Sequence, residues 1–304
     1  MTVFDTCEDV TLRGGPIRLY RAGPPDGPPV VLLHGAMYDR AELLWRHVTP
    51  RLAAGRNVVA VDLPRHGGSR PWTGVLDQAR LEEVLEALLD HIGAEHAHLV
   101  GHSMGGGLAL GFALGRPGRV RGLVVSAPGG IDDVRPWQFL TWLYLRTPGM
   151  PRLTAAWLAA SPGLLRASMA RSLAAGGRTP GFVEIMRLVA AEAEAKRRHR
   201  EGALDDWQIT SYGPRRMRLN LAPRLPGLAV PSLWLYGRRD TLVDERAMRR
   251  AVAAAPGARL EIIEDAGHLA PLDRPDVFAE LVLAFLDEVD AGRTPGRPGE
   301  GQPS

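Results

Sequence analysis

Short apolar runs alternate with amphipathic stretches along most of the chain. Six runs of four to five residues are rich in Val, Ile or Leu and lie next to turn-forming residues; they cover 30–33, 57–61, 98–101, 122–126, 232–236 and 259–263. Near-continuous apolar runs of this length are typical of strands buried on both faces of a parallel sheet. Residues 11–13 and 17–21 predict a preceding hairpin around Gly14 and Gly15.

Helical patterns separate these predicted strands. Apolar side chains recur at helical spacing over 81–92, with acidic residues on the opposite face, and this predicts an amphipathic helix packed on a sheet. Residues 104–114 are apolar all round and predict a buried helix, and 276–289 predict a last helix. Strands that alternate with helices indicate an α/β protein with a doubly wound, mostly parallel sheet.

The alternation stops between residues 131 and 225. This segment has no clear strand pattern, four of the seven Trp residues, and 15 basic against 8 acidic side chains, whereas the rest of the chain is net negative. We therefore predict a helical lid inserted between two core strands. The core then comprises residues 1–130 and 226–290, and the Gly/Pro-rich residues 291–304 predict a disordered tail.

The composition is that of a globular protein, and it also bears on possible partners and on the cellular compartment. The 304 residues are 45% hydrophobic and 23% charged, with a net charge of +3 that gives no reason to expect nucleic acid. One cysteine, Cys7, cannot form an intramolecular disulfide and fits a reducing compartment. The chain begins without a signal-peptide pattern and has no apolar run of about 20 residues. These features predict a cytoplasmic protein without a membrane span.

Two clusters of polar residues suggest binding sites but have simpler interpretations. The basic run 196–200 lies at the carboxyl end of a helical pattern, where positive charge complements the helix dipole, so we expect a solvated face. A second cluster lacks metal-ligand spacing and also predicts a solvated surface; it consists of His91, Glu95, His96 and His98. The chain has no dinucleotide fingerprint or phosphate loop, so no metal and no cofactor are expected.

The candidate chemistry begins with a G-x-S-x-G motif at residues 101–105. It follows a predicted strand and precedes a predicted buried helix, and a serine on such a tight turn needs small neighbours. A serine also needs a base that a third group orients. Asp240 and His268 each follow a later predicted strand and could supply these groups. Three other acids remain alternatives to Asp240, namely Asp244, Asp132 and Asp133.

With this order of Ser, Asp and His, the sequence resembles the α/β-hydrolase fold superfamily, in its lid-bearing branch, from about Val30 to Leu286. The resemblance implies that Ser103 is the nucleophile and His268 the general base. It also implies that Asp240 orients the imidazole of His268. His34, His66 and His102 are expected to be structural or supporting residues.

The resemblance extends to two further motifs. His34-Gly35 follows the third predicted strand, which implies an oxyanion hole formed by the backbone N–H groups of Ala36 and Met104. Residues 62–69 are similar to the D-x-P-G-H-G-x-S turn of the family. They depart from it at Arg65, where Gly is usual, and this leaves the shape of the turn open.

A serine nucleophile favours attack on a carbonyl, whereas the haloalkane dehalogenases and epoxide hydrolases of this fold use Asp. We therefore expect a serine hydrolase that cleaves a carboxylic ester or related small acyl substrate. C–C bond hydrolases, thioesterases, amidases and perhydrolases share the triad and remain alternatives, as does a non-catalytic small-molecule binder. Aromatic residues of the predicted lid would supply an apolar pocket wall unless they pack inside the lid; the candidates are Trp137, Trp142 and Trp157. The natural substrate and the oligomeric state stay open.

Overall fold

One eight-stranded sheet forms the centre of the computed structural model, which describes residues 3–293. The strands are β1 (Thr6–Leu12), β2 (Gly15–Ala22), β3 (Pro29–Leu33), β4 (Asn57–Asp62), β5 (Ala97–His102), β6 (Val120–Ser126), β7 (Ser232–Gly237) and β8 (Ala258–Ile263). Their order across the sheet is β1-β2-β4-β3-β5-β6-β7-β8. Strands β1 and β2 pair antiparallel with their neighbours, and all other pairs are parallel. The predicted mostly parallel α/β sheet and its leading hairpin are confirmed.

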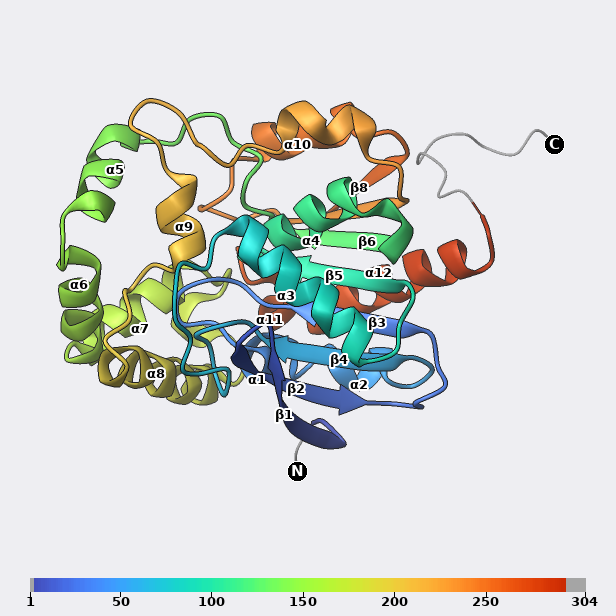
Figure 1. Cartoon of the computed structure of the whole chain (residues 1–304), viewed down its shortest axis with the longest axis horizontal. Coiled ribbons are helices and arrows are strands. Elements are labelled where there is room, and N and C mark those ends of the chain that lie inside the picture. The colour runs from blue at the N-terminus through green and yellow to red at the C-terminus, as the bar shows by residue number, and fades with distance from the viewer. Residues whose placement is uncertain (1–2, 294–304) are drawn as a thin grey trace.

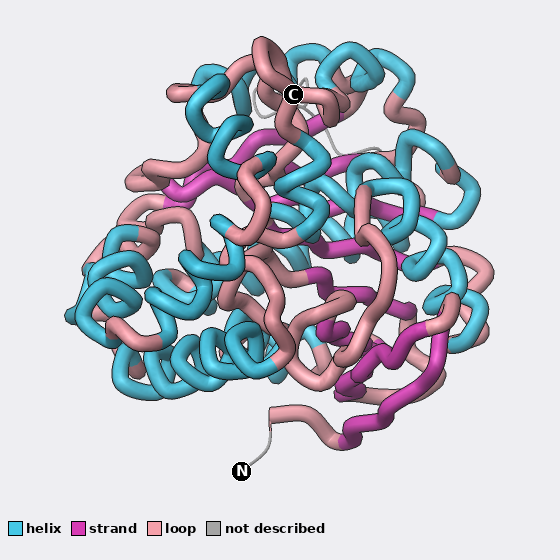
Figure 2. Tube along the Cα trace, turned by 60° about the vertical axis from the view of Figure 1, so that its left-hand side comes forward, coloured by secondary structure: helices cyan, strands magenta, loops and turns pink. Residues whose placement is uncertain are grey.

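Helices cover both faces of this sheet (Figures 1 and 2). One face carries α3 (Gln78–His91), α4 (Met104–Gly115) and α10 (Glu245–Ala254). The other carries α1 (Ala41–Trp45), α2 (Thr49–Leu52), α11 (Ala270–Asp273) and α12 (Pro275–Asp290). Alternate residues of β3 feed the two cores, since Val31 and Leu33 face one layer while Val30 and Leu32 face the other. A strand buried on both faces needs apolar residues at successive positions, which explains its unbroken apolar run.

Residues 131–225 form the inserted segment between β6 and β7. It consists of helices and loops, with α5 (Gln138–Arg146), α6 (Met150–Ala159), α7 (Pro162–Arg171), α8 (Phe182–Arg198) and α9 (Asp206–Ser211). All of its residues are described, and none belongs to a strand of the sheet. Figure 1 shows α5–α9 gathered at the left, beyond the end of the sheet to which the parallel strands point. The division of the chain into core and lid domains stays a prediction, and most of the predicted tail (291–304) lies outside the described residues.

Two residues expected on solvated surfaces are buried. The side chain of Lys196 is 1% exposed and its Nζ lies 2.5 Å from Asp205 Oδ1. His98 is completely buried in β5, with Nε2 3.0 Å from Asp290 Oδ1, and burial lowers the pKa of its imidazole to about 4. The expectation of a solvated surface is wrong for both residues, because each has a carboxylate partner that allows a polar side chain to be buried.

The described residues also bear on membrane and metal sites. None of the helices within residues 3–293 is long and apolar enough to cross a bilayer. Within the same range, no group of three or more His, Cys, Asp or Glu side chains could hold a metal ion.

Replacing Gly105 by Ala should destabilise the fold, because α4 begins in direct contact with β3. A Cβ atom at Gly105 would lie 2.4 Å from the backbone oxygen of Leu33, which cannot move without disturbing the sheet. We expect a loss of about 3 kcal/mol in the free energy of unfolding, measured by urea denaturation. The control is Gly115→Ala in the same helix, where a Cβ meets nothing within 4 Å and stability should not fall. Equal stability of both variants would contradict this packing.

Candidate active site

Ser103 lies on a strained turn between β5 and α4. Its backbone has φ 50° and ψ −112°, outside the regions that residues with side chains favour. A Cβ atom at Gly101 would lie 2.3 Å from the backbone oxygen of Gly105, so the turn requires glycine there. Strained backbone of this kind concentrates at functional sites, and here it presents the serine hydroxyl beyond the end of the sheet.

The structure brings Ser103, His268 and Asp240 into one chain of hydrogen bonds. Asp240 follows β7 and His268 follows β8. The distance from Asp240 Oδ2 to His268 Nδ1 is 2.9 Å, and that from His268 Nε2 to Ser103 Oγ is 3.1 Å. The other oxygen of Asp240 accepts the N–H groups of Leu242 (2.7 Å) and Val243 (3.2 Å).

These contacts determine the tautomer of His268. An ionised carboxylate only accepts hydrogen bonds, so Nδ1 of His268 must carry the proton that it donates to Asp240. Nε2 is then the acceptor for the Ser103 hydroxyl. The side chains of His268 and Asp240 are 8% and 0% exposed, which holds this arrangement away from bulk water. The geometry is that of a serine activated by an oriented base.

The other candidate acids are engaged elsewhere. Asp132 pairs with Arg135 at 2.9 Å, and Asp133 lies 3.4 Å from Arg216. Asp244 accepts the N–H of Arg246 at 3.2 Å and so caps α10. Of the four candidate acids, Asp240 is therefore the one that is hydrogen-bonded to His268.

Two backbone N–H groups are available next to Ser103. Among the described residues, neither the N–H of Ala36 nor that of Met104 has a hydrogen-bond acceptor in the protein. Met104 is the first residue of α4, so its N–H also belongs to the positive end of that helix. Both Ala36 and Met104 line the same cavity as Ser103. This arrangement could stabilise negative charge on a carbonyl oxygen.

The three remaining histidines of the motifs are buried and support the site. His102 packs against His268 with 4.8 Å between ring centroids, and burial lowers its pKa well below the usual range. His34 Nε2 accepts the N–H of Leu63 at 2.9 Å, and burial also lowers the pKa of His34. A neutral His102 avoids repulsion with an imidazolium at His268. None of the three, His34, His66 and His102, makes a hydrogen bond to Ser103.

The structure answers the question that Arg65 left open. Arg65 has φ 64°, in the left-handed region that favours glycine, so the turn keeps the backbone shape that glycine would permit. Its guanidinium Nη1 donates to Asp206 Oδ2 at 2.6 Å and so links the turn to α9. A non-glycine residue in this conformation costs about 1 kcal/mol, which the contact with Asp206 can offset in part.

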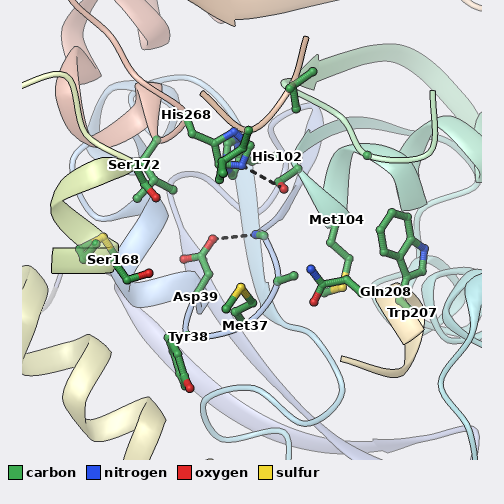
Figure 3. Close-up of a pocket in the computed structure, with 18 of the residues that line it drawn as sticks. Met37, Tyr38, Asp39, His102, Met104, Ser168, Ser172, Trp207, Gln208 and His268 are labelled. Carbon is green, nitrogen blue, oxygen red and sulfur yellow. Dashed lines mark hydrogen bonds between the residues drawn. The ribbon is translucent and has the colours of Figure 1, made fainter. Parts of the chain in front are cut away.

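A cavity of about 270 Å³ opens onto Ser103. Figure 3 shows Ser168 and Ser172 of the inserted segment on one side, Trp207, Gln208 and Met104 on the other, and Asp39 between them. Apolar side chains from both the core and the inserted segment complete the wall; they include Leu43, Leu165, Met169, Val189 and Met217. Such a concave, largely apolar site suits a small organic molecule.

The predicted tryptophans do not line this cavity. Trp137 and Trp157 are 77% and 60% exposed, and Trp142 contacts Phe139 on the same helix rather than the cavity. The assignment of Trp137, Trp142 and Trp157 to the pocket is therefore wrong for this structure, because helical spacing alone does not tell which face of α5 or α6 turns inward. Trp207 lines the cavity instead, and the acidic pair before it marks the start of α9.

Charged groups in the cavity are few and already bound. Asp39 accepts the N–H groups of Gly35 (2.7 Å) and Arg40 (2.9 Å), and burial raises the pKa of its carboxyl to about 7. Arg135 is the single Arg or Lys among the described lining residues, and it pairs with Asp132. The cavity therefore offers no free cation to an anionic ligand.

Comparisons with known proteins agree with this geometry. A family model described as alpha/beta hydrolase fold matches residues 28–275. The chain is 32% identical to 2-hydroxy-6-oxononadienedioate/2-hydroxy-6-oxononatrienedioate hydrolase 1 of Dechloromonas aromatica, over 84% of this chain and 86% of that protein. It is 25% identical to carboxylesterase YbfK of Bacillus subtilis, over 91% of this chain and 86% of that protein.

Another relative is longer than this chain. The dihydrolipoyllysine-residue acetyltransferase component of the acetoin cleaving system of Pseudomonas putida is 30% identical over 89% of this chain but 66% of its own length. Among solved structures, 2-hydroxy-6-oxo-6-phenylhexa-2,4-dienoate hydrolase from Rhodococcus sp. strain RHA1 has a TM-score of 0.73 and 25% identity. The match covers 93% of this chain and all of that one.

Proposed function

This chain belongs to the α/β-hydrolase fold family, and we propose that within it the protein is a serine hydrolase that cleaves small carboxylic esters. The observation that carries the proposal is the hydrogen-bonded chain from Asp240 through His268 to Ser103. The N–H groups of Ala36 and Met104 beside it, which have no acceptor within residues 3–293, support the same reaction.

In the proposed mechanism, Ser103 Oγ attacks the ester carbonyl while His268 Nε2 accepts its proton. Asp240 stabilises the imidazolium that forms and keeps its orientation. The N–H groups of Ala36 and Met104 donate to the tetrahedral oxyanion, where each donor contributes about 3–4 kcal/mol to the transition state. His268 then returns the proton to the leaving alcohol. A water molecule, deprotonated by the same imidazole, cleaves the acyl-enzyme and releases the acid.

The charges of the cavity favour a neutral ester over a dioate. The dioate hydrolases among the relatives are named for substrates with two carboxylates. In this chain the cavity holds the carboxyl of Asp39, and the charge of its one guanidinium, on Arg135, is already paired with Asp132 through Nε. A dianionic substrate would lose its hydration without gaining a free cation, which is costly. C–C bond cleavage remains the alternative that the names of the relatives favour.

We further propose that the inserted segment (131–225) acts as a lid over the substrate. Its α7 and α9 carry cavity-lining residues, among them Leu165, Ser168 and Trp207. A reducing, cytoplasmic location is in keeping with the single free cysteine, Cys7.

A panel of p-nitrophenyl esters tests the substrate class. We expect kcat/KM to rise about tenfold or more from acetate to hexanoate, because each buried methylene contributes up to about 0.8 kcal/mol. We also expect the hexanoate to be a better substrate than 2-hydroxy-6-oxononadienedioate, the compound for which the relative is named, because the cavity holds no unpaired cation for its carboxylates. The measurement is steady-state hydrolysis of each compound by the same preparation. Acetate turned over as fast as hexanoate would contradict the apolar pocket, and a preference for the dienedioate would favour C–C cleavage.

Two tryptophan variants provide the matched controls. Trp207→Ala removes a cavity wall and should weaken the preference for the longer acyl chain. Trp157→Ala changes a side chain that is 60% exposed and lies away from the cavity, and should leave the preference unchanged.

A further inference from the structure

Residues 34–40 form the oxyanion loop, which leaves β3 and carries Ala36. The two N–H groups that flank Ala36 are each held by a carboxylate. Gly35 donates to Asp39 Oδ2 at 2.7 Å, and Met37 donates to Asp205 Oδ2 at 2.7 Å. The N–H of Ala36 between them has no acceptor in the described part of the chain. Asp39 and Asp205 thus accept from the N–H groups on either side, and the N–H of Ala36 is left available to a ligand.

Asp205 comes from a distant part of the chain. It is the residue before α9, in the inserted segment, 168 positions after Met37. Its other oxygen lies 2.5 Å from Lys196 Nζ, and His66 Nε2 lies 3.3 Å from Oδ2. Lys196 is the only lysine in the sequence and its side chain is 1% exposed. This ammonium therefore finds its counter-ion in Asp205.

Asp205 is held as a carboxylate. Burial alone would raise the pKa of its carboxyl, but the charge of Lys196 and the contact with His66 lower that pKa overall. An ionised carboxylate makes a stronger hydrogen bond to a backbone N–H than a neutral acceptor does. The bond to Met37 matters for the backbone as well, because Met37 has φ 67°, in the left-handed region that costs a residue with a side chain about 1 kcal/mol.

We propose that Asp205 is a positioning residue for the oxyanion hole, which it reaches from the inserted segment to hold the N–H of Met37. The inference rests on the proposed function, because it assigns Asp205 a role in the proposed ester hydrolysis. With Asp205 in place, the loop keeps the left-handed turn at Met37 and the N–H of Ala36 stays free at the cavity. Without it, the loop can relax and the N–H of Ala36 can turn away from the reacting oxygen. The inserted segment then contributes to the chemical step as well as to substrate binding.

The neighbouring carboxylate offers a matched control. Asp206 also joins α9 to the core, since it accepts from Arg65 Nη1 at 2.6 Å and from the N–H of Leu76 at 3.0 Å. It makes no hydrogen bond to residues 34–40. Loss of Asp206 therefore weakens the attachment of α9 without removing a contact to the oxyanion loop.

The test compares Asp205→Asn with Asp206→Asn on p-nitrophenyl butyrate. The aspartate accepts from Met37 with one oxygen and from Lys196 with the other, whereas the amide introduced by Asp205→Asn has a single acceptor oxygen and could not serve both. We expect Asp205→Asn to lower kcat about 100-fold, because the loss of one oxyanion donor lowers kcat by about that factor. KM should stay within about threefold of the native value. Asp206→Asn should change both constants by less than about threefold. Inhibition by phenylboronic acid, whose adduct with Ser103 places an oxygen at the same N–H groups, should weaken in parallel with kcat/KM.

Several results would overturn the inference. Equal losses of kcat in Asp205→Asn and Asp206→Asn would mean that activity depends on the attachment of α9 and not on the contact with Met37. An unchanged kcat in Asp205→Asn would mean that the oxyanion loop does not need Asp205. Phenylboronic acid that inhibits Asp205→Asn as strongly as the native protein would also overturn the inference, because the oxyanion N–H groups would then be in place without Asp205. If Asp205→Asn lacks a cooperative thermal transition, Asp205→Glu keeps the charge beside Lys196 but displaces the carboxylate. Asp205→Glu should fold and show a smaller loss confined to kcat, and native kcat in this variant would overturn the inference.

The outcome for Ser103 separates the two proposals. Native activity in Ser103→Ala would refute the proposed function itself. Activity that is lost in Ser103→Ala but retained in Asp205→Asn would refute only the role of Asp205.

Discussion

Replacing Ser103 by Ala is expected to lower kcat for p-nitrophenyl butyrate by about 10⁵-fold, with little change in KM. The reason is geometric, because the Ser103 hydroxyl is the group that donates to His268 Nε2, at 3.1 Å. Without it, the imidazole can at most activate water, and the N–H groups of Ala36 and Met104 retain a small residual rate. Steady-state kinetics with fresh preparations of both proteins provides the measurement.

The control for Ser103→Ala is a second serine in the same chain. Ser161 precedes α7, lies outside the cavity and makes no side-chain capping bond to that helix. Ser161→Ala should retain native kcat. Comparable activity in Ser103→Ala and the native protein would exclude Ser103 as the nucleophile. Absence of activity in every preparation, with retained ligand binding, would favour the non-catalytic binder.

Asp240→Asn should lower kcat about 10⁴-fold. Asp240 Oδ1 accepts two backbone N–H groups, from Leu242 and Val243, so the oxygen of an asparagine should stay there. The amide nitrogen would then face His268 Nδ1, which could only accept. The proton of the imidazole would move to Nε2, and this nitrogen could no longer take the proton of Ser103. The measurement is kcat at neutral pH, together with a thermal melt to show that the variant folds.

Asp244→Asn serves as the matched control for Asp240→Asn. Asp244 lies four residues further along and caps α10 through the N–H of Arg246, at 3.2 Å. Asparagine caps a helix about as well as aspartate, so Asp244→Asn should leave both the stability and kcat nearly unchanged. A large loss of kcat in Asp244→Asn, with native kcat in Asp240→Asn, would reverse the roles of the two acids.

The sequence predicted the core because local pattern and tertiary burial agree there. Strands β3 to β7 are buried almost throughout, and their apolar runs can be recognised without a partner strand, whereas β8 at the edge of the sheet is only partly buried. The positions of Ser103, Asp240 and His268 follow from the same pattern, since each lies in the segment that follows a strand and the carboxyl ends of parallel strands share one edge.

The inserted segment was harder to predict in detail. Helical spacing indicates α5 and α6 but does not tell which face meets the core, and this is why the prediction that Trp137 and Trp157 line the cavity is wrong. Lys196 and Asp205 lie nine positions apart, and the structure joins Asp205 to the oxyanion loop and to the turn that contains His66. No periodicity encodes such a contact, because it depends on how the helices pack.

The most direct test of the proposed nucleophile is the intact mass of the protein after treatment with a fluorophosphonate. This reagent reacts with a serine that an adjacent base activates and that an oxyanion hole serves. We expect one adduct on the native protein, none on Ser103→Ala, and one on Ser161→Ala. An adduct that persists in Ser103→Ala, or a native protein that hydrolyses esters without forming any adduct, would contradict the assignment of Ser103 as an activated nucleophile.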